Sequence, residues 1–343
     1  MYRIGLIGTG RIAHTHVEGI RRVLPEKAEI TAVSDPRAEL RQAFCEQYGI
    51  PNEFSSIDEL ARSGTADVVI DLTPPFARLD VVPTAIENGL HILVEKPFGA
   101  TAKDAAHFVR LAEDAGVKLS VNQNFRWHPE IEATKEAVNS PTFGRLQYIS
   151  HVNFQDRTVP PGDWRKHEKR LELSIFSIHV LDRIIWVANR NPISVSAHMR
   201  QDSVRSYAGE QLTTLTVVFE DGLIGTMTSS WLSVGLPEAR LRVDSEHASV
   251  LALRPHALRG DATWHLQYRN QDAISKYFRD TGDDPLGIGV SLSKLLDALD
   301  TGAEPVNSGR DNLRTIGAVD AAYLSAERDG EYVTLEEVLG FKL

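Results

Sequence analysis

The chain has 343 residues, 42% of them hydrophobic and 24% charged, a composition typical of a soluble protein with about two domains. Its 47 acidic and 37 basic residues give a formal charge of −10, which repels phosphate backbones and argues against nucleic acid as a partner. The single cysteine, Cys45, excludes an intrachain disulfide, and neither a signal peptide nor a membrane span is recognisable, so we expect a cytoplasmic protein without a membrane partner.

Short apolar runs alternate with helical periods in the first third of the chain, a pattern typical of strand-helix-strand units and a parallel sheet. The predicted strands cover residues 3–8, 29–35, 66–72, 91–96 and 118–124. The predicted helices cover residues 11–24, 36–48, 57–63, 79–89 and 101–115. This order of elements predicts an α/β fold.

From about residue 145 the pattern changes to alternating β-rich segments with hairpin signals, of which Asp221-Gly222 is the clearest turn. The β-rich segments are 146–154, 193–200, 212–231 and 240–245, and they predict a largely antiparallel sheet. Residues 286–300 and 310–328 return to helix, and we expect a short strand near 331–335.

The first sign of chemistry is a glycine-rich turn. Gly8, Gly10 and Ala13 form a G-x-G-x-x-A pattern between a predicted strand and a predicted helix, where backbone can approach a pyrophosphate. Asp35 closes the next strand about twenty-five residues later, where its carboxylate can accept hydrogen bonds from ribose hydroxyls. A structural glycine turn with a capping aspartate is the alternative. Because a carboxylate repels a 2′-phosphate, we expect NAD rather than NADP, although Arg37 can soften that preference, so NADP stays possible.

Residues 171–182, LELSIFSIHVLD, are almost entirely apolar, with Glu172, His179 and Asp182 spaced seven and three apart. A regular helix would place all three side chains on one face. At this point two interpretations stay open, namely a set of catalytic groups or a buried helix with three satisfied polar side chains.

Several motifs resemble the Gfo/Idh/MocA family, named for glucose-fructose oxidoreductase, inositol dehydrogenase and a rhizopine catabolism protein. They stand in the family's order and spacing: GLIGTGRIA (5–13), DLTPP (71–75), VEKPFG (94–99), NQNFRWHP (122–129), GDWR (162–165), HVLD (179–182) and a final stretch at 312–335. The resemblance spans nearly the whole chain, and its most specific element is Glu-Lys-Pro after a dinucleotide fingerprint. It implies a Rossmann domain at residues 1–122 and, at residues 123–343, a C-terminal α/β domain with an open, mostly antiparallel sheet.

The resemblance also implies hydride transfer between a nicotinamide cofactor and a secondary hydroxyl of a sugar, sugar derivative or cyclitol. Lys96 would hold the reacting hydroxyl and His179 would take part in proton transfer. The implied substrate-binding residues are Asp182, Arg126, Asn124, Arg165 and Trp164. The implied cofactor-binding residues are Gly8, Gly10, Arg11, Ile12, Asp35, Thr73, Pro74, Glu95, Lys96 and Asn122.

General chemistry is consistent with this assignment. Hydride leaves a carbinol carbon readily only when the hydroxyl proton is withdrawn at the same time, which requires a base at the oxygen. An imidazole titrates near neutrality. A lysine can stabilise the developing alkoxide as a fixed positive charge, or act as the base if burial lowers its pKa. The polar side chains of residues 122–128 favour a hydroxyl-rich ligand over a lipid. His14, His16 and His128 show no metal-ligand spacing, so we expect no metal.

Two positions depart from the family pattern. Ile175 stands four residues before His179, where many members carry an aspartate that helps proton transfer. Arg78 stands where relatives often carry a histidine, and we expect it to face solvent at a helix start, with binding of a substrate carboxylate as the alternative. Glu172 either substitutes for the missing aspartate or is a favourable charge at a helix N-terminus. A satisfied structural histidine is the alternative for His179.

Two other functions therefore stay open. One is an NAD-retaining lyase or glycoside-cleaving enzyme that acts by transient oxidation of its sugar, and the other is a non-catalytic dinucleotide-binding sensor, which Ile175 favours. Family members commonly associate through the exposed face of the C-terminal sheet. We therefore expect a homodimer or homotetramer that uses the strands within 193–244, because a half-apolar sheet face needs cover.

Overall fold

The computed structural model describes residues 1–202, 205–282, 284 and 286–343; residues 203 and 204, inside the predicted interface range 193–244, lie outside the described residues. The chain divides into two compact units. The first contains Met1–Asn124 and Gly287–Leu313, and the second contains Phe125–Leu286 and Arg314–Leu343. The segment Gly287–Leu313, which the sequence analysis assigned to the C-terminal domain, thus belongs to the first unit.

The first unit is built on a six-stranded parallel sheet of order β3-β2-β1-β4-β5-β6. Its strands are β1 (Tyr2–Ile7), β2 (Ala28–Ser34), β3 (Asn52–Phe54), β4 (Val68–Asp71), β5 (His91–Val94) and β6 (Leu119–Val121). The connecting helices are α1 (Arg11–Val23), α2 (Ala38–Tyr48), α3 (Ile57–Arg62), α4 (Arg78–Glu87) and α5 (Ala102–Asp114). The predicted Rossmann fold is confirmed, and only the short strand β3 was missed among these elements.

Burial explains why the central strands read as unbroken apolar runs. All four residues of β4 are buried, as expected for a strand with both faces covered. Helix α8 (Ile288–Thr301) packs against α1 and contributes Leu292, Leu295 and Leu296 to the core of this unit. The approach is close, because a Cβ atom at Gly289 would stand 2.6 Å from the carbonyl oxygen of Gly19. A glycine and a leucine stripe on one helix face therefore attach a late segment of the chain to the first unit.

The second unit contains a nine-stranded sheet of order β14-β13-β12-β11-β7-β10-β9-β8-β15. Its strands are β7 (Leu146–Phe154), β8 (Pro192–Arg200), β9 (Leu212–Phe219), β10 (Ile224–Ser230), β11 (Glu238–Ser245), β12 (Ala248–Arg254), β13 (Ala262–Tyr268), β14 (Ile274–Phe278) and β15 (Val333–Thr334). Strands β7 and β10 pair in parallel, and the other neighbours pair antiparallel. The predicted open, mostly antiparallel sheet is therefore confirmed, with the predicted turn at Gly222, whose φ is 81°.

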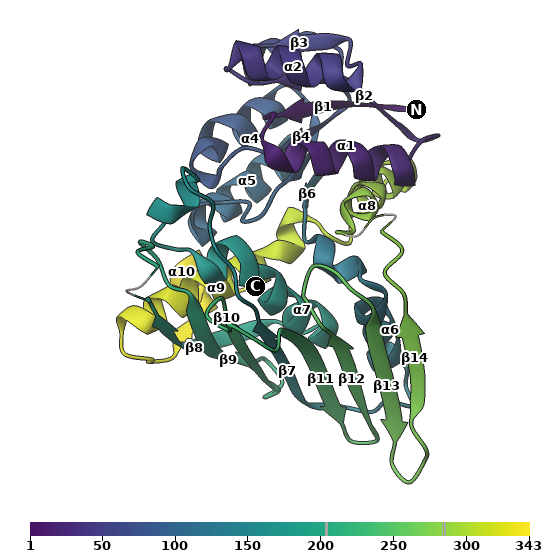
Figure 1. Cartoon of the computed structure of the whole chain (residues 1–343), viewed down its shortest axis with the longest axis vertical. Coiled ribbons are helices and arrows are strands. Elements are labelled where there is room, and N and C mark those ends of the chain that lie inside the picture. Colours follow the sequence, from purple (N-terminus) through teal and green to yellow (C-terminus); the bar gives the residue numbers. More distant parts are fainter. Residues whose placement is uncertain (203–204, 283, 285) are drawn as a thin grey trace. The chain divides into compact units, whose positions relative to one another are not determined.

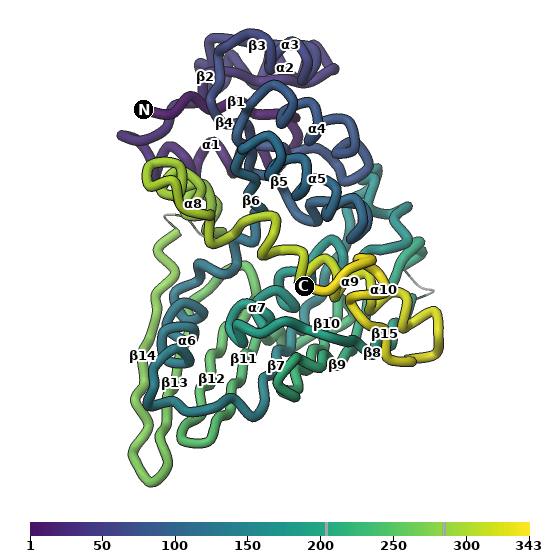
Figure 2. Tube along the Cα trace, turned by 180° about the vertical axis from the view of Figure 1, so that it is seen from behind, coloured from purple at the N-terminus to yellow at the C-terminus, as the bar shows by residue number. Residues whose placement is uncertain are grey.

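Helices α6 (Pro129–Asn139) and α7 (Ile178–Ala188) lie on one face of this sheet, and both views show them on the same side (Figures 1 and 2). Ile149, His151 and Asn153 of β7 are buried, whereas the alternate residues Tyr148 and Val152 stay half-exposed. Helices α9 (Gly309–Glu327) and α10 (Leu335–Leu339) end the chain. Helices α6 and α10 and strands β12, β13 and β14 were not predicted from the sequence. Within the described residues, no helix combines the length and apolar character needed to cross a bilayer.

A π-helix at Leu173–Ser177 precedes α7. The N–H of Ile178 bonds to the carbonyl of Leu173, five residues earlier, instead of the fourth residue of an α-helix. Glu172 therefore does not share a regular α-helix with His179 and Asp182, and the prediction that one such helix carries all three on one face is wrong. The spacing in the sequence could not reveal the extra residue in the turn.

Candidate active site

The glycine-rich turn joins β1 to α1. Gly8 has a φ of 101°, a conformation that favours glycine, and Gly10 is the N-cap of α1. A Cβ atom at Gly10 would meet nothing within 4 Å, and Gly10, as the N-cap, supplies no side-chain hydrogen bond to the first turn of α1. Arg11 begins the helix as an exposed residue, and Ile12 packs partly against the core. The open space at Gly10 and the N-terminus of α1 without an N-cap side chain fit a dinucleotide pyrophosphate.

Asp35 follows β2 and is buried beside that turn. Its carboxylate accepts a hydrogen bond from the backbone N–H of Thr9 at 2.9 Å, and two from the Arg37 guanidinium at 2.9 and 2.7 Å. Burial by itself would raise the pKa of Asp35, but the bonds from Arg37 and Thr9 hold it well below its usual range. An ionised carboxylate therefore lies next to the glycine-rich turn, as the dinucleotide fingerprint requires.

The loops that follow β4 and β5 are joined by a buried arginine. Arg78 donates one hydrogen bond to the carbonyl of Thr73 at 2.7 Å and another to the carbonyl of Pro97. Its Nε lies 3.4 Å from Oδ2 of Asp71, whose Oδ1 accepts bonds from the N–H and hydroxyl of Thr73. Burial raises the pKa of Asp71 and lowers that of Arg78. The expectation that Arg78 faces solvent is wrong. Its guanidinium is buried at the start of α4, where it contacts two backbone carbonyls and the Asp71 carboxylate.

Glu95 contacts two other polar side chains at the carboxyl edge of the parallel sheet. Its Oε1 lies 2.9 Å from Nε2 of His16 and accepts a bond from the Asn122 side chain at 2.7 Å. Burial raises the pKa of Glu95, but the contacts with His16, Lys96 and Asn122 lower it to about 2. The half-buried Lys96 follows, joined to Pro97 by a cis peptide bond. From the sequence, His16 was considered only as a metal ligand, so its contact with Glu95 was missed.

In the second unit, His179 lies in the first turn of α7 and is buried. Its ring stacks on that of Phe125, with centroids 4.2 Å apart and planes 19° apart. Ile175 and Phe125 belong to one hydrophobic cluster, against which the predicted residue Trp164 packs. Arg165 lies over the Trp164 ring at 5.8 Å and is paired with Asp163. The structure thus brings Trp164 into the same apolar cluster as the neighbour of His179.

Asp182 and Arg126 are bound to each other. The guanidinium donates two hydrogen bonds of 2.6 Å to the carboxylate, and Thr315 donates a third of 2.8 Å. Both partners are almost fully buried. Two predicted substrate-binding residues are therefore adjacent, while Asn124, also buried, is the last residue of the first unit's N-terminal segment.

Glu172 is completely buried at the start of the π-helix. Its carboxyl group accepts hydrogen bonds from Ser177 at 2.8 Å and Ser229 at 2.6 Å. Burial, and to a smaller extent the charge of Glu210, raise the pKa of Glu172 to about 7. Near neutrality this group is therefore partly protonated, unlike the ionised helix-start charge that one interpretation expected.

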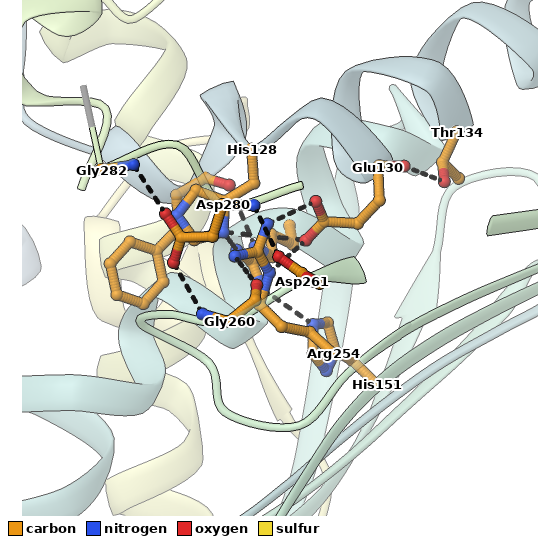
Figure 3. A network of polar contacts seen from close by, with 11 residues as sticks. His128, Glu130, Thr134, His151, Arg254, Gly260, Asp261, Asp280 and Gly282 are labelled. Carbon is orange, nitrogen blue, oxygen red and sulfur yellow. Dashed lines mark hydrogen bonds and ion pairs between the residues drawn. The ribbon is translucent and has the colours of Figure 1, made fainter. Parts of the chain in front are cut away.

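A further polar network lies beside α6. Arg254 forms a two-point ion pair with Glu130 at 3.0 and 2.8 Å, and His128 lies next to the same carboxylate (Figure 3). Arg183 bonds to His128 at 2.7 Å, and burial lowers the pKa of His128 to about 4. Glu130, Arg183 and Arg254 were not singled out in the sequence, because single charged residues in helices and strands are usually exposed. Across the described ranges, no group of His, Cys, Asp or Glu side chains is arranged to hold a metal ion.

Comparison with known proteins agrees with this geometry. Residues 2–123 match the GFO_IDH_MocA oxidoreductase family with its NAD-binding Rossmann fold, and residues 131–251 match the GFO/IDH/MocA C-terminal domain. The chain belongs to the Gfo/Idh/MocA family. The first unit is accordingly an NAD-binding domain, and the predictions of the family, of NAD and of oxidoreductase activity are confirmed.

Individual relatives extend over nearly the full length. The chain is 27% identical to D-apiose dehydrogenase of Paraburkholderia graminis, over 98% of this chain and 90% of that protein. It is 23% identical to inositol 2-dehydrogenase of Rhizobium meliloti, over 94% and 96%. Among solved structures, an oxidoreductase from Agrobacterium radiobacter in complex with NAD+, L-tartaric acid and magnesium has a TM-score of 0.89 at 21% identity, covering 98% and 99% of the two chains. This last likeness shows the fold.

Proposed function

We propose that the protein transfers hydride between a secondary hydroxyl of a sugar, sugar derivative or cyclitol and NAD. One observation carries the proposal: the carboxyl edge of the Rossmann sheet bears the glycine-rich turn, Asp35 and Glu95-Lys96-Pro97 together, in a chain with full-length similarity to apiose and inositol dehydrogenases. Relatives named as dehydrogenases also favour net oxidation over elimination or sensing without turnover.

In this proposal the first unit binds the cofactor. The first turn of α1 and Gly10 take the pyrophosphate, and Asp35 accepts hydrogen bonds from the adenosine ribose. Thr73, Pro74, Glu95 and Asn122 shape the nicotinamide end, whose position depends on the loops that Arg78 joins. Bound NAD supplies the hydride acceptor. The ionised Asp35 favours NAD over NADP, since a 2′-phosphate would meet a buried negative charge.

The proton is handled by the chain's own side chains. Lys96 holds the reacting hydroxyl and stabilises negative charge that develops on its oxygen, and His179 accepts the proton. Asp182 has two roles in this proposal. Its carboxylate holds the guanidinium of Arg126 in one orientation for substrate binding, and it also contacts the substrate directly. Asn124, Trp164 and Arg165 complete the proposed substrate-binding set.

The same proposal includes location and assembly. The single cysteine, which allows no intrachain disulfide, favours the reducing cytoplasm. A homodimer or homotetramer through the sheet face opposite α6 and α7 is supported by its half-exposed Tyr148, Val152 and Val218, flanked by exposed Ile224. Light scattering after gel filtration tests this assembly, and a monomer at micromolar concentration would contradict it.

The activity is tested in two steps. Mass spectrometry of gently purified protein should detect retained nicotinamide dinucleotide. A panel of sugars, polyols and glycosides with added NAD should then show accumulation of reduced nicotinamide with at least one polyol. Lys96→Ala and His179→Ala should lose most of that activity, and His179→Ala should retain NAD binding. Product without accumulated reduced nicotinamide would indicate a lyase instead, and wild-type activity in both variants would refute the catalytic assignment.

A further inference from the structure

Two imidazole rings stack on one phenylalanine in the second unit. The Phe125 ring lies 4.2 Å from the His179 ring, with planes 19° apart, and 5.1 Å from the His128 ring, with planes 25° apart. All three side chains are buried. Near-parallel rings at the shorter distance are in face contact, so the plane of the His179 imidazole follows the plane of Phe125.

Phe125 is itself held by a buried arginine. Arg183 donates from Nε to the carbonyl of Phe125 at 3.0 Å and from Nη2 to His128 Nδ1 at 2.7 Å. Its Nη1 lies 3.4 Å from Nε2 of His151. The guanidinium carbon also stands 5.1 Å from the centre of the Phe125 ring. Because the planar guanidinium of Arg183 contacts several partners at once, its orientation is fixed. Arg183 therefore restrains both the backbone and the ring of Phe125.

The position of Arg183 links this arrangement to the candidate base. Arg183 lies four residues after His179 in α7, so both side chains project from one face of the same helix. Helix α7 thus carries both His179 and Arg183, the residue that holds the Phe125 ring on which His179 stacks.

A proton acceptor must keep its ring oriented toward the reacting hydroxyl. In a histidine-carboxylate pair, a hydrogen bond from the second ring nitrogen gives that orientation. Ile175, one turn before His179, has no group that can do this. A flat apolar ring restrains the tilt of an imidazole without exchanging a proton with it.

We propose that Phe125 is a positioning residue for His179, and that Arg183 holds Phe125 in place for this purpose. The inference rests on the proposed function, because it takes His179 as the proton acceptor. Phe125 is not assigned contact with substrate or cofactor; it acts through His179.

Packing alone is the competing explanation, since Phe125 also belongs to the hydrophobic cluster with Ile175 and Phe176. A matched control separates the two. Phe143 is equally buried in the second unit, so Phe143→Leu removes the same number of atoms from a core position outside this cluster. Phe125→Leu and Phe125→Tyr are the informative pair, because tyrosine retains the ring face.

The stacking is tested first by NMR of protein with 13C-labelled histidine rings, with His179→Ala identifying the His179 signal. Phe125→Leu should move that signal downfield, because protons above an aromatic face are shielded, whereas Phe125→Tyr and Phe143→Leu should leave it near its wild-type position. Arg183→Lys keeps the charge and Phe125 but loses the fork, and should move the same signal. This variant keeps the test decisive if Phe125→Leu does not fold.

The consequence is tested by kinetics with the polyol that wild type oxidises fastest. Phe125→Leu should lower kcat about two- to tenfold, the size of a stacking contribution, with KM changed less than about twofold. Phe125→Tyr should restore kcat, and Phe143→Leu should keep it. An unmoved His179 signal, or equal losses of kcat in Phe125→Leu and Phe143→Leu, would overturn the proposal. Wild-type turnover in His179→Ala would instead refute the assignment of His179 as the proton acceptor, and the positioning role with it, even if the NMR signals still showed the stack. Absence of polyol-dependent reduced nicotinamide in wild type would refute the proposed function itself.

Discussion

Replacing Arg78 with methionine removes the guanidinium that joins the loops after β4 and β5, while it keeps an apolar side chain of similar length. The variant leaves the Asp71 carboxylate buried without its cation and the carbonyls of Thr73 and Pro97 without a donor. Removing one partner of a buried ion pair costs about 3–5 kcal/mol, and hydrogen bonds from a charged donor contribute about 1.5–3 kcal/mol each. Because these contributions overlap, we expect a loss of about 3–5 kcal/mol in the free energy of unfolding of the first unit.

Hydrogen exchange measured by mass spectrometry is the suitable assay, because all five tryptophans lie in the second unit and their fluorescence does not report on the first. Peptides from β4 and β5 should exchange faster in Arg78→Met by a factor that corresponds to this loss. The double variant Asp71→Asn with Arg78→Met should recover part of the stability, since it removes the unpaired charge. A loss below about 1 kcal/mol, the range of an exposed ion pair, would show that Arg78 faces solvent and that the two loops do not depend on it.

Three further outcomes are expected. The pKa of Glu172 is about 7 in the folded protein against 4.5 ordinarily, so the folded state binds the proton more tightly. The free energy of unfolding of wild type, relative to that of Glu172→Gln, should therefore fall by up to about 3 kcal/mol as pH rises from about 4.5 to 7. Urea unfolding measures both values, and a constant difference between the two proteins across that range would contradict this. Asp35→Ala removes the negative charge that repels a 2′-phosphate and frees Arg37 from its bonds to Asp35. The kcat/KM with NADP, divided by the kcat/KM with NAD, should therefore rise about tenfold or more. An unchanged ratio would place Asp35 away from the ribose. Glu130→Gln leaves Arg254 buried without its carboxylate and should destabilise the second unit by about 3 kcal/mol, measured by tryptophan fluorescence, whereas a change within about 0.5 kcal/mol would show that the pair is exposed to water.

Local patterns were enough to predict the framework of the first unit. Apolar runs of strand length between helical periods predicted its Rossmann fold. Gly8, Gly10 and Asp35 predicted a glycine-rich turn beside a carboxylate, and the structure contains both. Each of these features depends on residues near one another in the chain, where backbone conformation and strand order restrict the possibilities. The alternation of the later strands likewise predicted the antiparallel sheet.

Contacts between distant segments decided the rest. Arg78 was predicted to be a surface residue, but it is buried and donates hydrogen bonds to the carbonyls of Thr73 and Pro97. Glu172 was predicted to lie in a regular helix, but it precedes a π-helix and accepts a hydrogen bond from Ser229. Helix α8 joined the first unit because Gly289 fits against α1. A sequence shows which side chains can be charged, but their burial and pairing depend on which remote elements pack around them, and those long-range contacts set the environment of each polar group.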